Sequence, residues 1–127
     1  MFKKDAPKKL GDEAETRALS HLQQQGLRLV ERNYRVAAGP NARGGEVDLI
    51  LRERDGTLVF VEVRARASGD FGGAAASVTA AKQRRLAFAA QQYLLRMATP
   101  PPCRFDVIAI DGERIEWLRA AFDLSAP

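Results

Sequence analysis

The chain has 127 residues, of which 46% are hydrophobic and 28% are charged, a balance typical of a single globular domain. Its net charge of +4 favours anionic partners such as nucleic acid, although many basic proteins bind none. No apolar run approaches the roughly 20 residues of a membrane-spanning helix. No apolar segment follows the basic N-terminus as it would in a secretory signal, so we expect a cytoplasmic protein that does not bind membranes. The single cysteine, Cys103, excludes an intramolecular disulfide and a cysteine-based zinc site.

The first predicted element is a helix from residue 8 to about 25, ended by Gly26. Its apolar residues recur at helical spacing: Leu10, Ala14, Ala18, Leu19 and Leu22. Glu13 and Glu15 lie on this helix, where contact with solvent is the ordinary role of a glutamate. His21 has no second histidine, cysteine or base at ligand spacing, so we expect it at the surface or at the edge of the core.

A predicted strand, residues 27–36, and a glycine-rich loop, residues 38–45, come next. Two apolar runs follow, and each carries a carboxylate: Asp48 in residues 45–51 and Glu62 in residues 58–64. An acid inside a buried strand must be paired, bound to a metal or turned to solvent, because burial of an unpaired charge is costly. These two carboxylates are the features that most need an explanation.

The two runs form a hairpin around Arg54-Asp55-Gly56, and the hydrophobic pattern indicates its register. A two-residue turn would mismatch the apolar faces, whereas a three-residue loop, with Gly56 in the left-handed region, makes one face wholly apolar. The predicted partners are Val47 with Val63, Leu49 with Val61 and Leu51 with Val59, and on the other face Asp48 with Glu62 and Glu46 with Arg64. Facing carboxylates repel each other. We therefore expect a cation between them, which is Arg64, Arg66 or a divalent metal ion.

A second glycine-rich segment, residues 67–76, precedes a helix that begins at the predicted N-cap Thr79 and runs to about residue 97. Lys82, Arg84 and Arg85 crowd its first two turns. Cations there oppose the helix dipole, which favours contact with an anion, and a solvated face is the alternative.

Strands at residues 104–110 and 114–118 complete the predicted order of helix, three strands, helix and two strands. This order predicts an α/β fold with a mixed central sheet of about five strands flanked by helices. We expect a single domain over residues 1–127, with loose tails at 1–7 and 121–127. Trp117 is expected to be a packing residue.

The facing carboxylates suit a hard divalent cation such as Mg²⁺ or Mn²⁺, which takes oxygen ligands. Such an ion generates hydroxide from bound water and stabilises charge on a phosphodiester under attack. Arg64 shares a strand face with Glu62, so it could hold a phosphate. A plain salt bridge is the more common arrangement of an acid and an arginine on a hairpin, and the spacing leaves both interpretations open.

The motif Glu62-Val63-Arg64, with Asp48 in the preceding strand and Glu15 on the first helix, resembles the PD-(D/E)XK nuclease superfamily and its Holliday-junction-resolvase branch. The chain resembles the YraN-like family of small bacterial proteins, regarded as endonucleases, more closely still. The matching residues cover nearly the full length: Gly11 and Glu15, 32–35, 45–50, 59–64, 71–78, Lys82 and 104–106. The resemblance implies a restriction-endonuclease-like core.

The resemblance also implies that Asp48 and Glu62 are metal ligands and that Glu15 reaches the same site, which replaces the solvated role expected for Glu15. Arg64 stands where the superfamily has a lysine, and arginine stays protonated, so it cannot be the general base. Three alternatives follow: the metal-bound water needs no protein base, Lys82 projects into the site, or catalysis has been lost. The implied catalytic set is Glu15, Asp48, Glu62, Arg64 and Lys82.

The expected function is a Mg²⁺-dependent endonuclease acting on branched or structured DNA, and the alternative is a catalytically silent nucleic-acid-binding or adaptor domain. Phosphate contacts bind the DNA backbone without reading sequence. The residues expected to make them are Arg43, Arg66, Lys82, Arg84 and Arg85. Resolvases act on two-fold symmetric junctions and tend to be dimers, so a homodimer is one alternative that the resemblance offers. The oligomeric state stays open, because no stretch of the sequence displays an interface.

Overall fold

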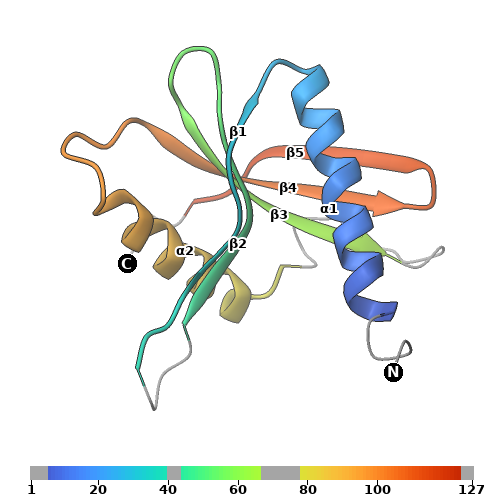
Figure 1. The fold of residues 1–127 in the computed structure, drawn as a ribbon, viewed down its shortest axis with the longest axis horizontal. Coiled ribbons are helices and arrows are strands. Elements are labelled where there is room, and N and C mark those ends of the chain that lie inside the picture. Colours follow the sequence, from blue (N-terminus) through green and yellow to red (C-terminus); the bar gives the residue numbers. More distant parts are fainter. Residues whose placement is uncertain (1–5, 40–43, 67–77, 124–127) are drawn as a thin grey trace.

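The computed structural model describes residues 6–39, 44–66 and 78–123, which form one five-stranded mixed sheet and two helices (Figure 1). The elements are α1 (Ala6–Gln24), β1 (Arg28–Val36), β2 (Gly45–Arg52), β3 (Leu58–Arg66), α2 (Ala80–Leu94), β4 (Cys103–Asp111) and β5 (Arg114–Phe122). The strands lie side by side in chain order, and all neighbours are antiparallel except β3 and β4, which are parallel. This confirms the predicted α/β fold class and element order.

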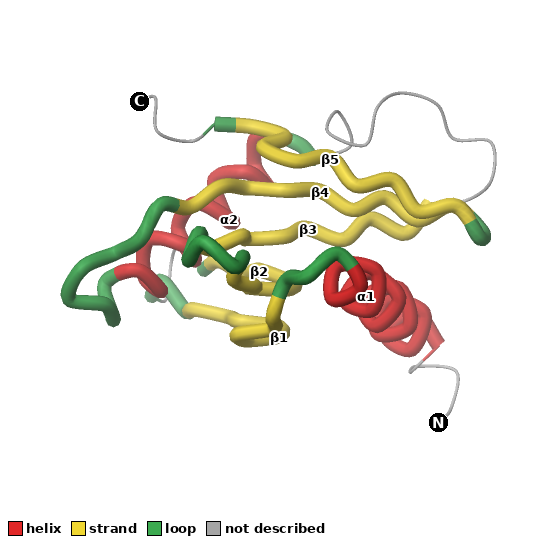
Figure 2. The backbone as a smooth tube through the Cα atoms, turned by 90° about the horizontal axis from the view of Figure 1, so that it is seen from above, coloured by secondary structure: helices red, strands yellow, loops and turns green. Residues whose placement is uncertain are grey.

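The two helices cover opposite faces of the sheet (Figure 2). On one face, α2 packs through Leu86 and Tyr93 against Ile50, Phe60 and other apolar side chains of the central strands. On the other face, Ala18 and Leu22 of α1 contact a second cluster that includes Leu49 and Ile108. Central strands buried on both sides explain why their sequences are nearly continuous apolar runs. Neither described helix has the length and apolar content needed to cross a membrane.

The hairpin between β2 and β3 has the predicted loop. Glu53 N donates to Thr57 O and Gly56 N donates to Glu53 O, both at 2.9 Å, so the loop is Arg54-Asp55-Gly56. Gly56 has φ +96°, as expected for the left-handed residue of such a loop.

The register of this hairpin is confirmed for Leu49 with Val61 and for Leu51 with Val59. Within the part of the chain that the structure describes, the ladder stops at Leu49 and Val61. The predicted continuation, with Asp48 opposite Glu62, Glu46 opposite Arg64 and Val47 opposite Val63, is therefore wrong as a set of ladder pairs. The physical reason lies at Asp48, whose side chain takes the Val63 amide, as described below.

Two elements extend into the ranges predicted as tails, residues 1–7 and 121–127. Helix α1 already begins at Ala6, and β5 continues past Leu118 to Phe122. The pairing of β5 with β4 shifts register between Phe105 and Val107, and Ala120 has φ +48°. Because the register shifts here, the alternation of apolar and polar residues does not predict where β5 ends.

Strand β1 is irregular as well. Its pairing with β2 shifts register between Leu29 and Glu31, and Asn33 has φ +57°. The pairs on either side are Arg32 with Leu49 and Tyr34 with Val47, so the strained Asn33 stands beside Asp48. Backbone in this region is uncommon outside glycine, although asparagine tolerates it better than most residues do.

Gly45 marks the closest approach of β2 to α2. A Cβ atom on Gly45 would lie 2.3 Å from the Arg85 carbonyl oxygen and 2.8 Å from the Ala89 nitrogen, so backbone would have to move. We expect Gly45→Ala to lower the free energy of unfolding by about 1–3 kcal/mol, measured by urea denaturation. Gly11→Ala is the matched control, because a Cβ there meets no atom within 4 Å. Alanine in a helix interior should instead stabilise the fold, and equal losses at both positions would contradict the packing argument.

Candidate metal and nucleic-acid site

A cleft of about 220 Å³ opens where β2 and β3 part from each other. In Figure 1, β2 descends with β1 while β3 runs across with β4, so the sheet splays at this end. The splay lets both helices reach one cleft even though they cover opposite faces of the sheet. The charged residues that line it are Glu15 from α1, Glu46 and Asp48 from β2, Glu62 from β3, and Lys82 and Arg85 from α2.

Asp48 lies where the alternation of β2 breaks. Val47 packs with the α2 cluster and Leu49 with the α1 cluster, although residues two apart on a regular strand share a face. The Asp48 Oδ2 atom accepts a hydrogen bond from the Val63 backbone N–H at 2.8 Å. The side chain thus replaces a backbone partner at the point where the ladder ends. This substitution also places the carboxylate beside Glu62, to which it is hydrogen bonded.

Burial disfavours ionisation of both carboxylates, and Glu62 disfavours that of Asp48 further. Burial, followed by the charge of Glu62, raises the pKa of Asp48 to about 7, although the Val63 N–H opposes the shift. Burial also raises the pKa of Glu62, which is only 9% exposed, against the opposing effects of Lys82 and Arg64. The free protein therefore keeps a proton in the pair near neutral pH.

The expected cation between the pair is only partly in place. The Arg64 Nη1 atom lies 3.7 Å from Glu62 Oε2, and the Lys82 Nζ atom lies 3.9 Å from the same oxygen. The structure thus places Lys82 of α2 beside the carboxylates. This is the arrangement required by the alternative in which Lys82 projects into the site. The side chain of Arg66 lies outside the described residues, as does Arg43.

Glu15 lines the same cleft, as the resemblance implied, but another residue holds it. Arg32 Nε lies 3.4 Å from Glu15 Oε1, and Arg32 Nη2 donates to the Asp12 carbonyl and to Thr16 Oγ1, both at 2.9 Å. Burial and the charge of Asp48 raise the pKa of Glu15, and Arg32 and Asn33 oppose the shift. Sequence reasoning included Arg32 in the matching motif without giving it a role.

Among the described residues, the predicted metal ligands do not gather into one group. Within residues 6–39, 44–66 and 78–123, no three histidine, cysteine, aspartate or glutamate side chains converge as a metal-binding group. Asp48 and Glu62 provide two carboxylates in contact, and Glu15 is engaged by Arg32 on the side of the cleft. The roles of Glu15, Asp48 and Glu62 as ligands remain predictions.

The basic residues of α2 have different surroundings. Arg85 Nη2 lies 3.2 Å from Glu46 Oε1, and Arg35 Nε on β1 lies 3.7 Å from Glu46 Oε2. The predicted partner of Glu46 was Arg64, but β1 and α2 supply its partners instead. Arg84 is exposed on α2 and does not line the cleft.

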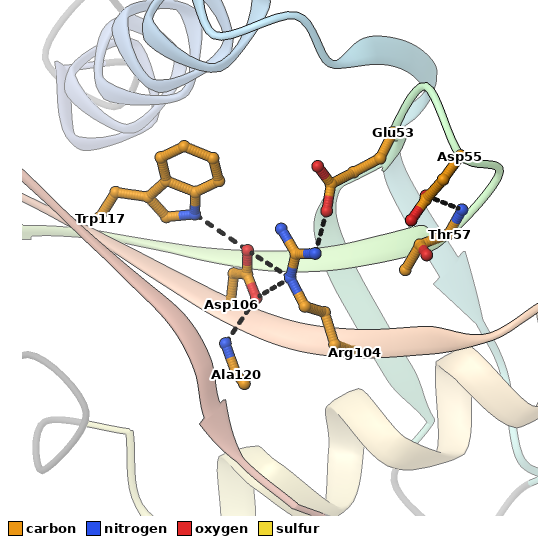
Figure 3. Close-up of polar contacts among 7 residues, drawn as sticks. All are labelled: Glu53, Asp55, Thr57, Arg104, Asp106, Trp117 and Ala120. Carbon is orange, nitrogen blue, oxygen red and sulfur yellow. Dashed lines mark hydrogen bonds and ion pairs between the residues drawn. The ribbon is translucent and has the colours of Figure 1, made fainter.

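Sequence reasoning missed a second polar cluster, which lies outside the cleft (Figure 3). The fully buried carboxylate of Asp106 accepts hydrogen bonds from Arg104 Nε at 3.0 Å and from Trp117 Nε1 and the Ala120 N–H, both at 2.9 Å. Arg104 also pairs with Glu53 in the β2–β3 loop. Trp117 is therefore a hydrogen-bond donor as well as a packing residue. The signal in the sequence that could have indicated this cluster is Asp106 itself, an acid within an apolar strand.

The family model that matches is described as "Uncharacterised protein family UPF0102" and spans residues 14–110. The UPF0102 protein of Methylibium petroleiphilum is 66% identical over 118 residues, which are 93% of this chain and 97% of that protein. The UPF0102 protein of Paracidovorax citrulli is 60% identical over 121 residues, with coverage of 95% and 87%. That of Cupriavidus necator is 58% identical over 116 residues, with coverage of 91% and 84%. The matched residues 14–110 contain all the charged residues that line the cleft.

Proposed function

The chain belongs to the UPF0102 family, which is the YraN-like family, and we propose that this member is a divalent-metal-dependent endonuclease acting on branched or structured DNA. The observation that carries the proposal is the hydrogen-bonded carboxylate pair of half-buried Asp48 and buried Glu62, in a cleft lined by Lys82 and Arg85. A carboxylate pair that retains a proton is a site where a cation gains from entering.

The donor set fits Mg²⁺ or Mn²⁺, because both ions prefer oxygen ligands and commonly bind through one or two carboxylates. Asp48 and Glu62 would hold the ion, and Glu15 is the nearest further carboxylate in the cleft. When bound, such an ion acts as a Lewis acid and activates water for attack on a phosphodiester.

The cations of the cleft would bind and orient the phosphodiester. The guanidinium of Arg64 would contribute by binding negative charge, because its planar fork suits a phosphate. Lys82 enters the cleft from α2, and its ammonium lies 3.9 Å from Glu62 Oε2. This arrangement favours Lys82 over Arg64 as the counterpart of the superfamily's lysine. The proposed biological unit is a homodimer, which matches a two-fold symmetric junction.

The test is cleavage of a panel of linear, flapped and four-way DNAs, with Mg²⁺, with Mn²⁺ and with EDTA. We expect metal-dependent cleavage of the branched DNAs and an increase in thermal stability, about 2.7 kcal/mol when the metal is at 100 times its Kd. Asp48→Ala and Glu62→Ala should reduce cleavage to the level of the EDTA control and abolish the stability gain. Glu116→Ala, which removes an exposed carboxylate of β5, should retain both.

The second candidate is a catalytically silent nucleic-acid-binding or adaptor domain. Two observations favour it: Glu15 is tied to Arg32 and is not gathered with the other acids, and arginine replaces the superfamily's lysine. Salt-dependent binding of DNA, without cleavage and without any metal-induced gain in stability, would support this candidate and contradict the nuclease.

A further inference from the structure

Glu46 bridges two arginines from different elements. Its two carboxylate oxygens face Arg85 Nη2 of α2 at 3.2 Å and Arg35 Nε of β1 at 3.7 Å. The Glu46 and Arg85 side chains are each 37% exposed and that of Arg35 is 72% exposed, so solvent reaches all three. Arg85 Nε is buried and has no hydrogen-bond partner among the residues that the structure describes. Both guanidiniums therefore keep donors that Glu46 does not use.

Glu46 also stands on the boundary between two cavities. The first is the cleft with Asp48 and Glu62, and the second, of about 520 Å³, lies next to it and includes Arg35. Glu46 lines both, together with Gly11 and Glu15. A ligand that extends from the carboxylate pair into the second cavity would therefore cross this shared boundary, with Arg85 in the first cavity and Arg35 in the second.

We propose that Arg35 and Arg85 form a phosphate-binding pair and that Glu46 occupies this pair in the free protein, as an internal competitor that a phosphodiester displaces. Guanidinium groups bind phosphate and carboxylate with the same planar fork, so one anion can replace the other. The inference rests on the proposed function for the class of ligand, a nucleic-acid backbone, but it requires neither metal nor cleavage.

The competitor makes binding selective. An anion with one phosphate has only one contact to offset the cost of displacing Glu46. A polyanion makes further contacts elsewhere, for instance at Lys82. The cost of displacing Glu46 opposes the binding of every anion, and only a polyanion makes enough further contacts to overcome it. The opposing interpretation is that Glu46 only joins β1, β2 and α2 as a structural salt bridge.

The test is DNA binding in EDTA, measured by fluorescence anisotropy with a labelled duplex and a labelled four-way junction over a range of salt concentrations. We expect Glu46→Gln to raise the affinity about fivefold at low salt, because it frees both arginines. The dependence of log K on log salt should become steeper by about one. Glu31→Gln is the matched control, because Glu31 is 38% exposed and pairs with Arg96 at 3.5 Å outside both cavities. It removes the same charge and should change the affinity less than twofold.

Two further variants separate competition from general electrostatics. Glu46→Asp keeps the net charge but shortens the side chain, so the affinity should rise, though less than with Glu46→Gln. In an Arg35→Met/Arg85→Met background, Glu46→Gln should lose its effect. A similar gain in that background, no rise with Glu46→Gln, or equal gains for Glu31→Gln and Glu46→Gln would overturn the proposal. Circular dichroism melts of each variant show whether a loss of binding comes from unfolding, and Glu46→Asp provides the test if Glu46→Gln unfolds.

The outcomes separate this inference from the proposed nuclease. If Glu46→Gln raises metal-free affinity while no DNA is cleaved, the inference stands and the nuclease fails. If cleavage occurs and Glu46→Gln leaves affinity unchanged, the nuclease stands and the inference fails. If neither the protein nor any variant binds DNA, the inference is overturned.

Discussion

Asp48→Asn is expected to make the metal-free protein more stable than the unchanged chain at pH 8, by about 2–4 kcal/mol. Loss of a hydrogen-bonded acid normally destabilises a protein, but Asp48 is half-buried beside another acid, and burial and the charge of Glu62 raise its pKa to about 7. Asparagine keeps an oxygen that can accept the Val63 N–H and removes the charge that is costly to bury.

The sign of the pH dependence follows from the direction of the shift. A carboxyl whose pKa is higher in the folded than in the unfolded state binds its proton more tightly when folded, so it stabilises the fold at low pH. For Asp48 this stabilisation is lost as the pH rises from about 4, the unfolded value, to about 7. The advantage of Asp48→Asn should therefore be largest above pH 7 and small near pH 4.

Urea denaturation in EDTA at several pH values measures this effect. Asp55→Asn is a control of opposite sign, because the Thr57 amide lowers the pKa of the exposed Asp55. Asp55 contributes stability above its unfolded pKa and loses it as the pH falls, so its removal should give no gain at pH 8. A pH-independent effect of Asp48→Asn would show that Asp48 does not carry the buried charge described above.

Asp106→Ala should lower the free energy of unfolding by about 3–5 kcal/mol, because it removes the shared acceptor of Arg104 Nε, Trp117 Nε1 and the Ala120 N–H. Arg104 would keep Glu53, but Trp117 Nε1 and the Ala120 N–H would each lose their acceptor in the interior. Asp106→Asn should cost less, since its oxygen still accepts one of these hydrogen bonds.

Urea denaturation measures the loss of stability in each variant. A double-mutant cycle with Arg104→Met shows how strongly Asp106 and Arg104 depend on each other. Removing both partners leaves no unpaired buried charge, so the loss in the double variant should be smaller than the sum of the single losses. Simple additivity would show that Asp106 and Arg104 act independently. Glu116→Ala on the neighbouring strand is exposed and should have little effect.

Local rules were sufficient for the element order and for most of the hairpin. The apolar faces of β2 and β3 permit one register, and Gly56 permits one loop, so Leu49 with Val61 could be predicted from the pattern. Thr79 was likewise predictable as an N-cap, and its hydroxyl accepts the Lys82 N–H at 3.2 Å.

The errors arose where a side chain competes with the backbone or where partners are distant in sequence. Asp48 takes the amide that would otherwise have continued the ladder, and a pattern of alternating faces contains no such competitor. Arg104 and Glu53 are 51 residues apart, and Arg85 and Glu46 are 39 apart. Pairs of this kind follow from the packing of α2 and β4 onto the sheet, which the sequence pattern indicates only in outline.

The irregular edge strand β1 constrains how two copies of this protein could meet. A sheet edge can recruit another strand when it is long, flat and apolar, and proteins prevent this with charges and bulges. Strand β1 has both: a register shift beside Leu29, the strained backbone of Asn33, and the exposed cations Arg28 and Arg35. A homodimer that continued the sheet across β1 would bring these like charges together. Two-fold assembly is therefore disfavoured at this edge, which leaves the Arg35 side of the second cavity open to a ligand.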